Sequence, residues 1–141
     1  MPRRSRAREV VLQLLYQDDL NPAPDIEAIE KFLRGRLAGD EALIDFARSL
    51  RQGVRRNREE LDQLLGERAR NWSLERMAAT DRNILRLGAF EILYTETPDR
   101  VAINEAVELA KRYGAKQSSQ FVNGILDRLL HDVRSEEQDD T

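Results

Sequence analysis

The stretch that decides the fold runs from Thr80 to Tyr94 and reads TDRNILRLGAFEILY. Its apolar residues lie nearly all round a helical wheel, which is typical of a helix at the centre of a core. Thr80 is a suitable N-cap, and Asp81 is favourable in the first turn, near the positive end of the helix dipole. Gly88 costs helix propensity, so we expect it to permit close packing by a neighbour. The sequence therefore predicts a buried central helix over about 81–95.

The segments on both sides of this helix repeat apolar residues at helical spacing, while the alternation typical of strands is nearly absent. Proline and glycine separate the segments, notably at Pro22, Pro24, Gly39 and Gly114, because both residues interrupt helices. The expected helices cover 3–18, 25–36, 41–65 (one helix, or two joined near Gly53), 81–95, 100–113 and a last one from 118 or 119, with a short element at 73–78. The sequence therefore predicts an all-α bundle of about seven helices.

The apolar stripes of the first two helices indicate which faces turn inward. They are Ala7, Val10, Val11, Leu14 and Leu15 in the first helix, and Ile26, Ile29, Phe32 and Leu33 in the second. We expect both stripes to be buried in the core.

The length and composition are typical of one globular domain with a charged surface: 141 residues, 40% hydrophobic and 35% charged. We expect a single domain over 1–134 and a loose acidic tail over 135–141. The chain has no cysteine, which excludes disulfides and cysteine nucleophiles. No apolar run approaches the ~20 residues that cross a membrane, and no signal-peptide pattern follows the first arginines. These features lead us to expect a soluble cytoplasmic protein.

Patterns that carry catalysis or bind metals are missing from the sequence. It has one histidine, His131, and no HExxH, Walker A or GxSxG motif. Acids such as Glu105 and Glu108 lie on an exposed helix face, where charges usually only solvate the surface. No group of acids or histidines has metal-ligand spacing. We therefore expect no enzyme activity, no catalytic residue, no metal site and no cofactor.

Positive charge is concentrated at the N-terminus although the net charge is −3, since Arg3, Arg4, Arg6 and Arg8 occur without an acid among them. The planar guanidinium suits phosphate oxygens and stacks on bases. On a helical wheel Arg8 and Tyr16 lie beside the apolar stripe, so they could share an exposed or half-exposed face. A cation beside a ring is what single-stranded RNA binding uses. A solvated helix start, with Tyr16 packed at the edge of the core, explains the same residues equally well.

A second basic stretch follows in the third predicted helix. It consists of Arg48, Arg51, Arg55, Arg56 and Arg58, interleaved with Asp45, Glu59 and Glu60. Alternating charge of this kind favours an exposed, ion-paired helix over a nucleic-acid site.

Four segments together resemble the NusB family. They are Arg3–Glu9 with Leu15–Tyr16, Asp81–Leu87 continuing to Phe90–Ile92, Val101–Lys111 ending in Tyr113–Gly114, and Phe121–Asp127. Their order, their spacing and the chain length fit that family from end to end. The resemblance implies a NusB-like bundle of two packed three-helix subdomains, and a transcription antitermination factor that is not an enzyme.

The resemblance also implies the partners. They are the boxA element of ribosomal RNA leaders, bound as a single strand, and the small-subunit ribosomal protein NusE. The complex then joins NusA, NusG and RNA polymerase to suppress termination. A homodimer that hides the RNA face is compatible with the family.

Individual roles follow from matching positions to the family. The RNA-contacting set is Arg4, Arg6, Arg8 and Tyr16 on the arginine-rich helix, with the neighbouring Arg3, and Gln117 and Phe121 near the last helix. The set assigned to the protein partner is Asp81, Arg82 and Arg86. Ser5, Gln117 and Ser119 depart from the family pattern. Core packing is an alternative role for Phe121, because Ile125 lies one turn further along.

Two other functions fit a helical chain of this kind. One is a regulatory domain related to the N-terminal domain of ribosomal RNA cytosine methyltransferases. The absence of a downstream Rossmann domain and of a catalytic cysteine argues against it. The other is a protein-interaction scaffold that has lost RNA binding, and the retained arginines argue against that.

Overall fold

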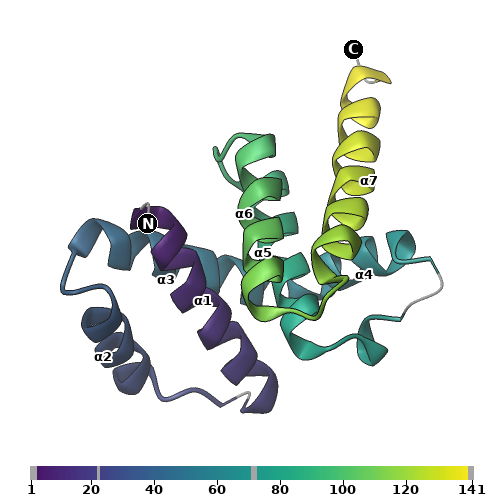
Figure 1. Ribbon diagram of the computed structural model, residues 1–141. Coiled ribbons are helices and arrows are strands. Elements are labelled where there is room, and N and C mark those ends of the chain that lie inside the picture. The colour runs from purple at the N-terminus through teal and green to yellow at the C-terminus, as the bar shows by residue number, and fades with distance from the viewer. Residues whose placement is uncertain (1–2, 22, 71–72, 140–141) are drawn as a thin grey trace. The chain divides into compact units, whose positions relative to one another are not determined.

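The computed structural model describes residues 3–21, 23–70 and 73–139, so Pro22 and the last two residues of the expected tail lie outside that part. Within it the chain is all helical, as predicted, and has no strand (Figure 1). The elements are α1 (Arg3–Leu20), α2 (Ile26–Arg36), α3 (Glu41–Arg56), α4 (Arg58–Arg68), a 3₁₀ turn η1 (Leu74–Arg76), α5 (Ala79–Tyr94), α6 (Asp99–Tyr113) and α7 (Ser118–Asp139). They divide into two compact units, 1–56 and 57–141.

The first unit holds α1, α2 and α3, and its core lies mainly between α1 and α3. The predicted stripe of α1 is confirmed, because all five of its residues are at most 2% exposed. Ile44, Ala47, Leu50 and Val54 supply the facing side of α3. Asp25 caps α2 by accepting a hydrogen bond from the Ala28 amide, and Asp40 caps α3 through the Leu43 amide.

The prediction for α2 is wrong at its N-terminal end. Leu33 is buried, but Ile29 and Phe32 are only half-buried and Ile26 is 71% exposed. Leu37, directly after the helix, is also buried. The physical reason is that α2 packs chiefly through its C-terminal end, so an apolar residue in its first turn keeps its surface in solvent.

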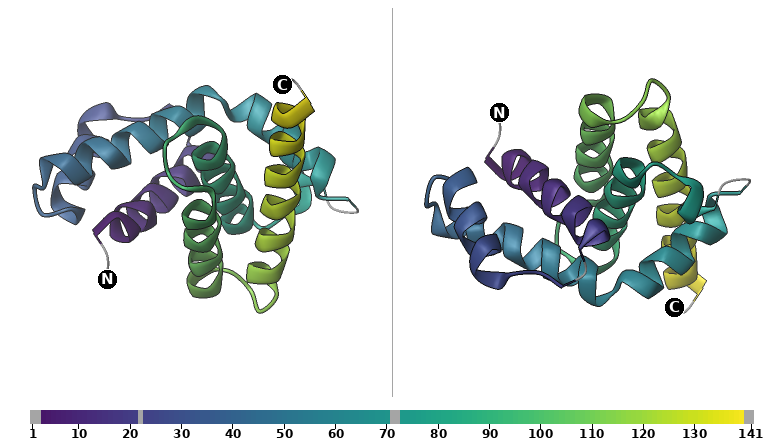
Figure 2. Two further views of the ribbon diagram at one scale, coloured as in Figure 1. Left: turned by 90° about the horizontal axis from the view of Figure 1, so that it is seen from above. Right: turned by 90° about the horizontal axis from the view of Figure 1, so that it is seen from below.

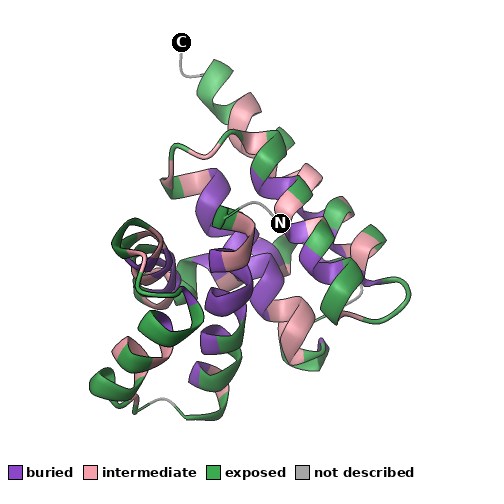
Figure 3. Cartoon of the chain, turned by 60° about the vertical axis from the view of Figure 1, so that its left-hand side comes forward, coloured by how far each residue is buried: buried purple, intermediate pink, exposed green. Residues whose placement is uncertain are grey.

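The second unit packs α5, α6 and α7 against one another, and α4 lies against α5 and α7. The views in Figure 2 show the three long helices side by side. Figure 3 shows buried positions gathered along the inner faces of the helices. The predicted central helix is confirmed, because α5 is buried over Asn83–Ile92. No helix in the described ranges is long and apolar enough to cross a membrane.

Three local boundaries differ from the sequence-based expectation. Helix α3 continues through the buried Gly53 and ends at Arg56, and Asn57 begins the next helix because its carbonyl accepts the Leu61 amide. Helix α5 begins at Ala79, since the Arg82 amide already bonds to the carbonyl of Ala78, so Thr80 is not the N-cap.

The third difference is at the C-terminus. Helix α7 continues to Asp139, into the segment expected to be a loose tail. Arg134 supports the start of this extension, because its guanidinium pairs with Asp99 on α6 at 2.7 Å and with Glu137 one turn on at 2.9 Å.

Gly88 permits the close packing of α5 expected from the sequence. A β-carbon there would lie 2.7 Å from Leu126 Cδ1 and 3.2 Å from the β-carbon of Ala106. We expect Gly88→Leu to lower the free energy of unfolding by about 1–3 kcal/mol or more, the usual cost of overpacking. Urea denaturation measures it. Gly35→Leu is the matched control, because nothing lies within 4 Å of a β-carbon at Gly35 on α2. Equal stability of the two variants would contradict this account.

Candidate functional site

The N-terminal arginines of the first unit present exposed charge on the first turn of α1. Arg3 and Arg4 are exposed, and the Arg6 side chain is 43% exposed. Arg3 pairs with Asp40, and Arg6 Nη1 lies 3.1 Å from Glu9 Oε2. The Arg3–Asp40 pair lies at the surface, where ion pairs contribute little, so an incoming phosphate can compete for the Arg3 guanidinium. The Glu9 carboxylate is only 7% exposed, so it holds Arg6 from the buried side while part of that guanidinium stays accessible.

Arg4 is oriented by a ring from another helix. Its guanidinium carbon lies 4.5 Å from the ring centroid of Phe46 on α3, within the range of a cation–π contact. Phe46 was not predicted as a functional residue; it lies beside the apolar stripe of α3 and is half-buried. The sequence does show an aromatic residue beside an apolar stripe, which could have indicated a functional ring. Only the fold shows that this ring contacts Arg4.

The expectation that Arg8 lies on an exposed face with Tyr16 is wrong for Arg8. Arg8 is only 3% exposed, and its guanidinium carbon lies 5.2 Å from the same Phe46 centroid. A helical wheel of α1 cannot show that a ring from α3 covers this position. Tyr16 is 43% exposed, so its ring is open to a ligand.

The second basic stretch is charged and ion-paired, but the expectation of an exposed helix is wrong at Arg51, which is only 8% exposed because it binds the buried Asp18 on α1. Arg48 binds Glu30 on α2 and also Asp45, and its hydrogen bonds hold the pKa of Glu30 below the ordinary value. Arg51 and Arg55 both bind Asp18 on α1, at 2.6 and 2.9 Å. These arginines clamp the helices of the first unit together.

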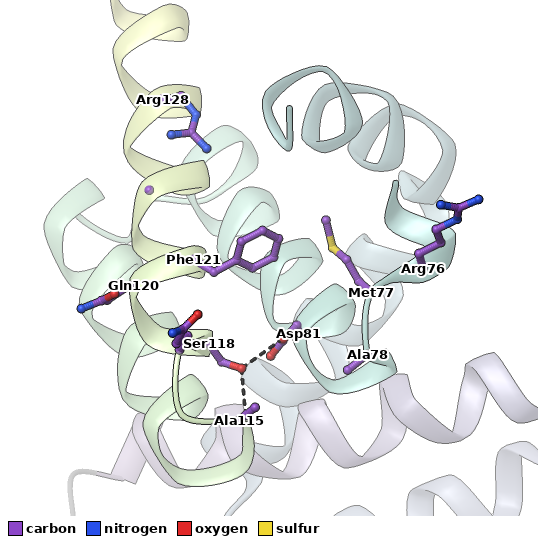
Figure 4. Close-up of a pocket in the computed structure, with 11 residues that line it drawn as sticks. Arg76, Met77, Ala78, Asp81, Ala115, Ser118, Gln120, Phe121 and Arg128 are labelled. Carbon is purple, nitrogen blue, oxygen red and sulfur yellow. Dashed lines mark hydrogen bonds between the residues drawn. The ribbon is translucent and has the colours of Figure 1, made fainter. Parts of the chain in front are cut away.

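A hollow of about 510 Å³ opens in the second unit between the start of α7 and the segment that leads into α5. It is lined by Gln117, Phe121 and Asp81, although the first two were predicted to contact RNA and Asp81 the protein partner. Figure 4 shows the Phe121 ring pointing into the space toward Met77. The ring is half-buried, so it combines a packing contact with an accessible face.

Asp81 is tied to the start of α7. Its Oδ2 accepts a hydrogen bond from the Ser118 hydroxyl at 3.1 Å, and that hydroxyl accepts one from the Ala115 amide at 2.8 Å (Figure 4). The other oxygen, Oδ1, is buried and has no hydrogen-bond partner among the described residues. A buried acceptor of this kind is costly unless a ligand or a water supplies a donor.

The other two residues assigned to a protein partner have structural contacts. Arg86 is 3% exposed, and its Nε and Nη2 donate to both carboxylate oxygens of Asp62 on α4, at 2.7 and 2.9 Å. Arg82 is half-buried and donates to the carbonyl of Leu74 at 3.1 Å, which holds the 3₁₀ turn against α5. Because the Arg86 guanidinium is buried and paired with Asp62, we interpret Arg86 as a residue that holds the fold together.

Each unit thus offers a surface on which arginines and aromatic rings lie together. Within the described residues no group of three or more acids or histidines is placed to hold a metal ion. Exposed guanidinium groups beside accessible rings are suited to phosphates and unstacked bases.

Comparison with known proteins gives consistent matches over most of the chain. The NusB family model matches residues 5–131. A transcription antitermination protein NusB of Anaeromyxobacter dehalogenans is 43% identical over 127 residues, covering 90% of this chain and 89% of the relative. The protein of the same name from Myxococcus xanthus is 45% identical over 133 residues, covering 92% and 95%.

Solved structures match in the same way. T. maritima NusB aligns with a TM-score of 0.80 at 38% identity, covering 93% of this chain and 92% of that one. A crystal structure of antitermination factors NusB and NusE in complex with double-stranded RNA includes a chain that aligns with a TM-score of 0.82 at 25% identity, covering 94% and 98%.

Proposed function

The chain belongs to the NusB family, whose relatives are named transcription antitermination proteins, and we propose that it is a cytoplasmic antitermination factor, not an enzyme. We propose that it binds single-stranded boxA RNA together with the ribosomal protein NusE. The complex joins NusA, NusG and RNA polymerase to suppress termination. The observation that carries the RNA part is the exposed turn of Arg3, Arg4 and Arg6, with Arg4 oriented on the Phe46 ring. A related chain in a crystal structure with NusE and double-stranded RNA supports RNA and NusE as partners, and the choice of a single strand rests on the chemistry of the exposed rings.

The chemistry favours a single strand as the RNA form. Arg3, Arg4 and Arg6 supply phosphate contacts, and the rings of Tyr16 and Phe121 supply faces for bases that are not stacked in a helix. Gln117, exposed at the rim of the hollow, adds an amide that can hydrogen-bond to a base edge. Fluorescence anisotropy tests the preference for a single strand by comparing single-stranded boxA RNA with the same sequence in a duplex. Tighter binding of the duplex would contradict that preference.

The ribosomal-protein contact is proposed at the start of α5. Asp81 and Arg82 are both half-buried there and remain partly accessible, whereas Arg86 acts indirectly by holding α4 on α5. Charge reversal, Asp81→Lys, is expected to weaken capture of purified NusE by tenfold or more, about the cost of an unfavourable charge in an interface. Ser118→Ala is the matched control, because it removes the hydrogen bond to Asp81 and keeps the charge. Undiminished capture by Asp81→Lys would place the contact elsewhere.

A further inference from the structure

Arg36 is an exposed cation at the C-terminal end of α2 that is held in place without being neutralised. Its Nη2 donates to the side-chain oxygen of Gln13 on α1 at 3.0 Å, and its guanidinium carbon lies 5.3 Å from the ring centroid of Phe32, one turn earlier on α2. An amide oxygen and a ring orient a guanidinium but carry no net charge. Arg36 therefore keeps its full charge and most of its N–H donors for a ligand.

The acids within five residues of Gln13 or Arg36 in the sequence are each paired with another arginine. These pairs are Glu9 with Arg6, Asp18 with Arg51, Asp40 with Arg3, and Glu41 with Arg34. Arg36, by contrast, forms no ion pair with any residue that the structure describes. A phosphate that binds Arg36 thus displaces no carboxylate, which distinguishes it from Arg34 in the same turn of α2.

The contact with Gln13 places Arg36 beside the face of α1 that carries proposed RNA contacts. Gln13 lies two turns after Arg6 on the same face, because seven residues of a helix return almost to the same direction. Tyr16 is exposed one turn further on. At a rise of about 1.5 Å per residue, the helix from Arg6 to Tyr16 is about 15 Å long, a length that several nucleotides cover. Arg36 supplies a cation along this path, between the arginine turn and the Tyr16 ring.

The side chains of this face favour RNA over a protein segment. Between Arg6 and Tyr16 the exposed side chain of α1 is the amide of Gln13, and the amide of Gln17 is exposed one turn later. Amides hydrogen-bond to base edges, and the guanidinium of Arg36 matches the oxygens of a phosphate. The centre of a protein interface is mostly apolar, and this stretch of α1 offers no exposed apolar side chain between the arginines and Tyr16.

We propose that Arg36 is a further RNA contact, which binds a phosphate of the single strand as it passes from the arginine turn to Tyr16. Gln13 and Phe32 act as positioning residues for its guanidinium. This proposal rests on the proposed RNA-binding function, and it extends the path of the RNA from α1 onto the end of α2.

The test is a salt series of binding to single-stranded boxA RNA. We expect Arg36→Gln to weaken binding by roughly fivefold near 0.1 M salt and to make the salt slope shallower by about 0.7, the contribution of one phosphate contact. Arg36→Lys keeps the charge but not the planar fork, so its slope should stay native while its affinity falls. Arg34→Gln is the matched control, because it removes an equal charge from an exposed, ion-paired arginine in the same turn, and it should keep the native slope.

A double-mutant cycle tests the positioning role of Gln13. Gln13→Ala should weaken RNA binding with an unchanged salt slope, and it should have little further effect when Arg36→Gln is already present, because the two side chains act as a unit. Equal effects of Gln13→Ala in both backgrounds would overturn the positioning role.

Three results would overturn the proposal or its premise. A native salt slope for Arg36→Gln, or equal losses in Arg36→Gln and Arg34→Gln, would exclude a phosphate contact at Arg36. Weaker capture of purified NusE by Arg36→Gln in the absence of RNA, with RNA binding unchanged, would assign Arg36 to the protein partner. No RNA binding by the native chain would overturn the proposed function itself.

Discussion

Replacement of Asp18 by alanine is expected to lower the free energy of unfolding by about 3–5 kcal/mol, the cost of leaving a buried charge unpaired. Arg51 Nε and Nη2 donate to the two carboxylate oxygens of Asp18, at 3.0 and 2.6 Å, and both side chains are about nine-tenths buried. Arg55 adds a third contact to the same carboxylate. This cluster joins α1 to α3, so its loss weakens the helix that carries the arginine turn. Urea denaturation followed by circular dichroism measures the change.

Two controls isolate the effect of burial. Asp45→Ala removes a carboxylate whose side chain is 70% exposed, and it should cost less than about 1 kcal/mol. The double variant Asp18→Leu with Arg51→Met removes both buried charges, and it should recover most of the stability that Asp18→Ala loses. A loss below 1 kcal/mol for Asp18→Ala would show that the pair does not hold α1 on α3.

Simultaneous replacement of Arg3, Arg4 and Arg6 by alanine is expected to weaken binding of single-stranded RNA by roughly 100-fold near 0.1 M salt. The reason is counterion release, which contributes a slope of about −0.7 per phosphate contact to a plot of log affinity against log salt, or roughly fivefold per contact at that salt. The slope itself should become shallower by about 2. Loss of Arg3 and Arg4 should change stability little, because both are exposed, whereas loss of Arg6 also removes an ion pair of the buried Glu9 carboxylate.

Phe46→Leu is the companion variant for the arginine turn. It keeps every charge but removes the ring that lies against Arg4 and Arg8. We expect a weaker affinity with an unchanged salt slope, because the phosphate contacts remain while their orientation is lost. A triple arginine variant with the native salt slope would exclude this turn as the RNA contact.

The parts of the fold that depend on local pattern were predictable from the sequence. The apolar positions of α5 from Ile84 to Ile92 and the stripe of α1 are buried as expected, because helical spacing alone determines which side chains share a face. At the end of α5 the expectation is wrong, because Leu93 is only half-buried and Tyr94 is 45% exposed. The predicted burial of Ile26 was wrong because it depends on packing between helices. Its exposure depends on how far α2 extends beyond the helices it packs on, and spacing within α2 carries no information about that.

The candidate site was predictable in its residue types but not in its contacts. Arg8 meets Phe46 from another helix, and Ser118 meets Asp81 across 37 positions of sequence. In the sequence Arg86 resembles a surface charge, because its partner Asp62 lies 24 positions earlier and only the fold brings the two together. The hollow brings Asp81 beside Phe121, so a residue proposed for the protein partner and one proposed for RNA line the same space. Such pairings follow from helix packing, which the one-dimensional pattern does not encode.

The proposed function requires that the chain bind boxA RNA specifically and together with NusE. Its most direct test is a titration of labelled single-stranded boxA RNA and of a scrambled RNA of equal length and composition, each with and without purified NusE, at a fixed salt concentration. We predict tighter binding of boxA than of the scrambled sequence, with the difference increased by NusE. Equal affinity for the two RNAs, both alone and with NusE, would contradict the account.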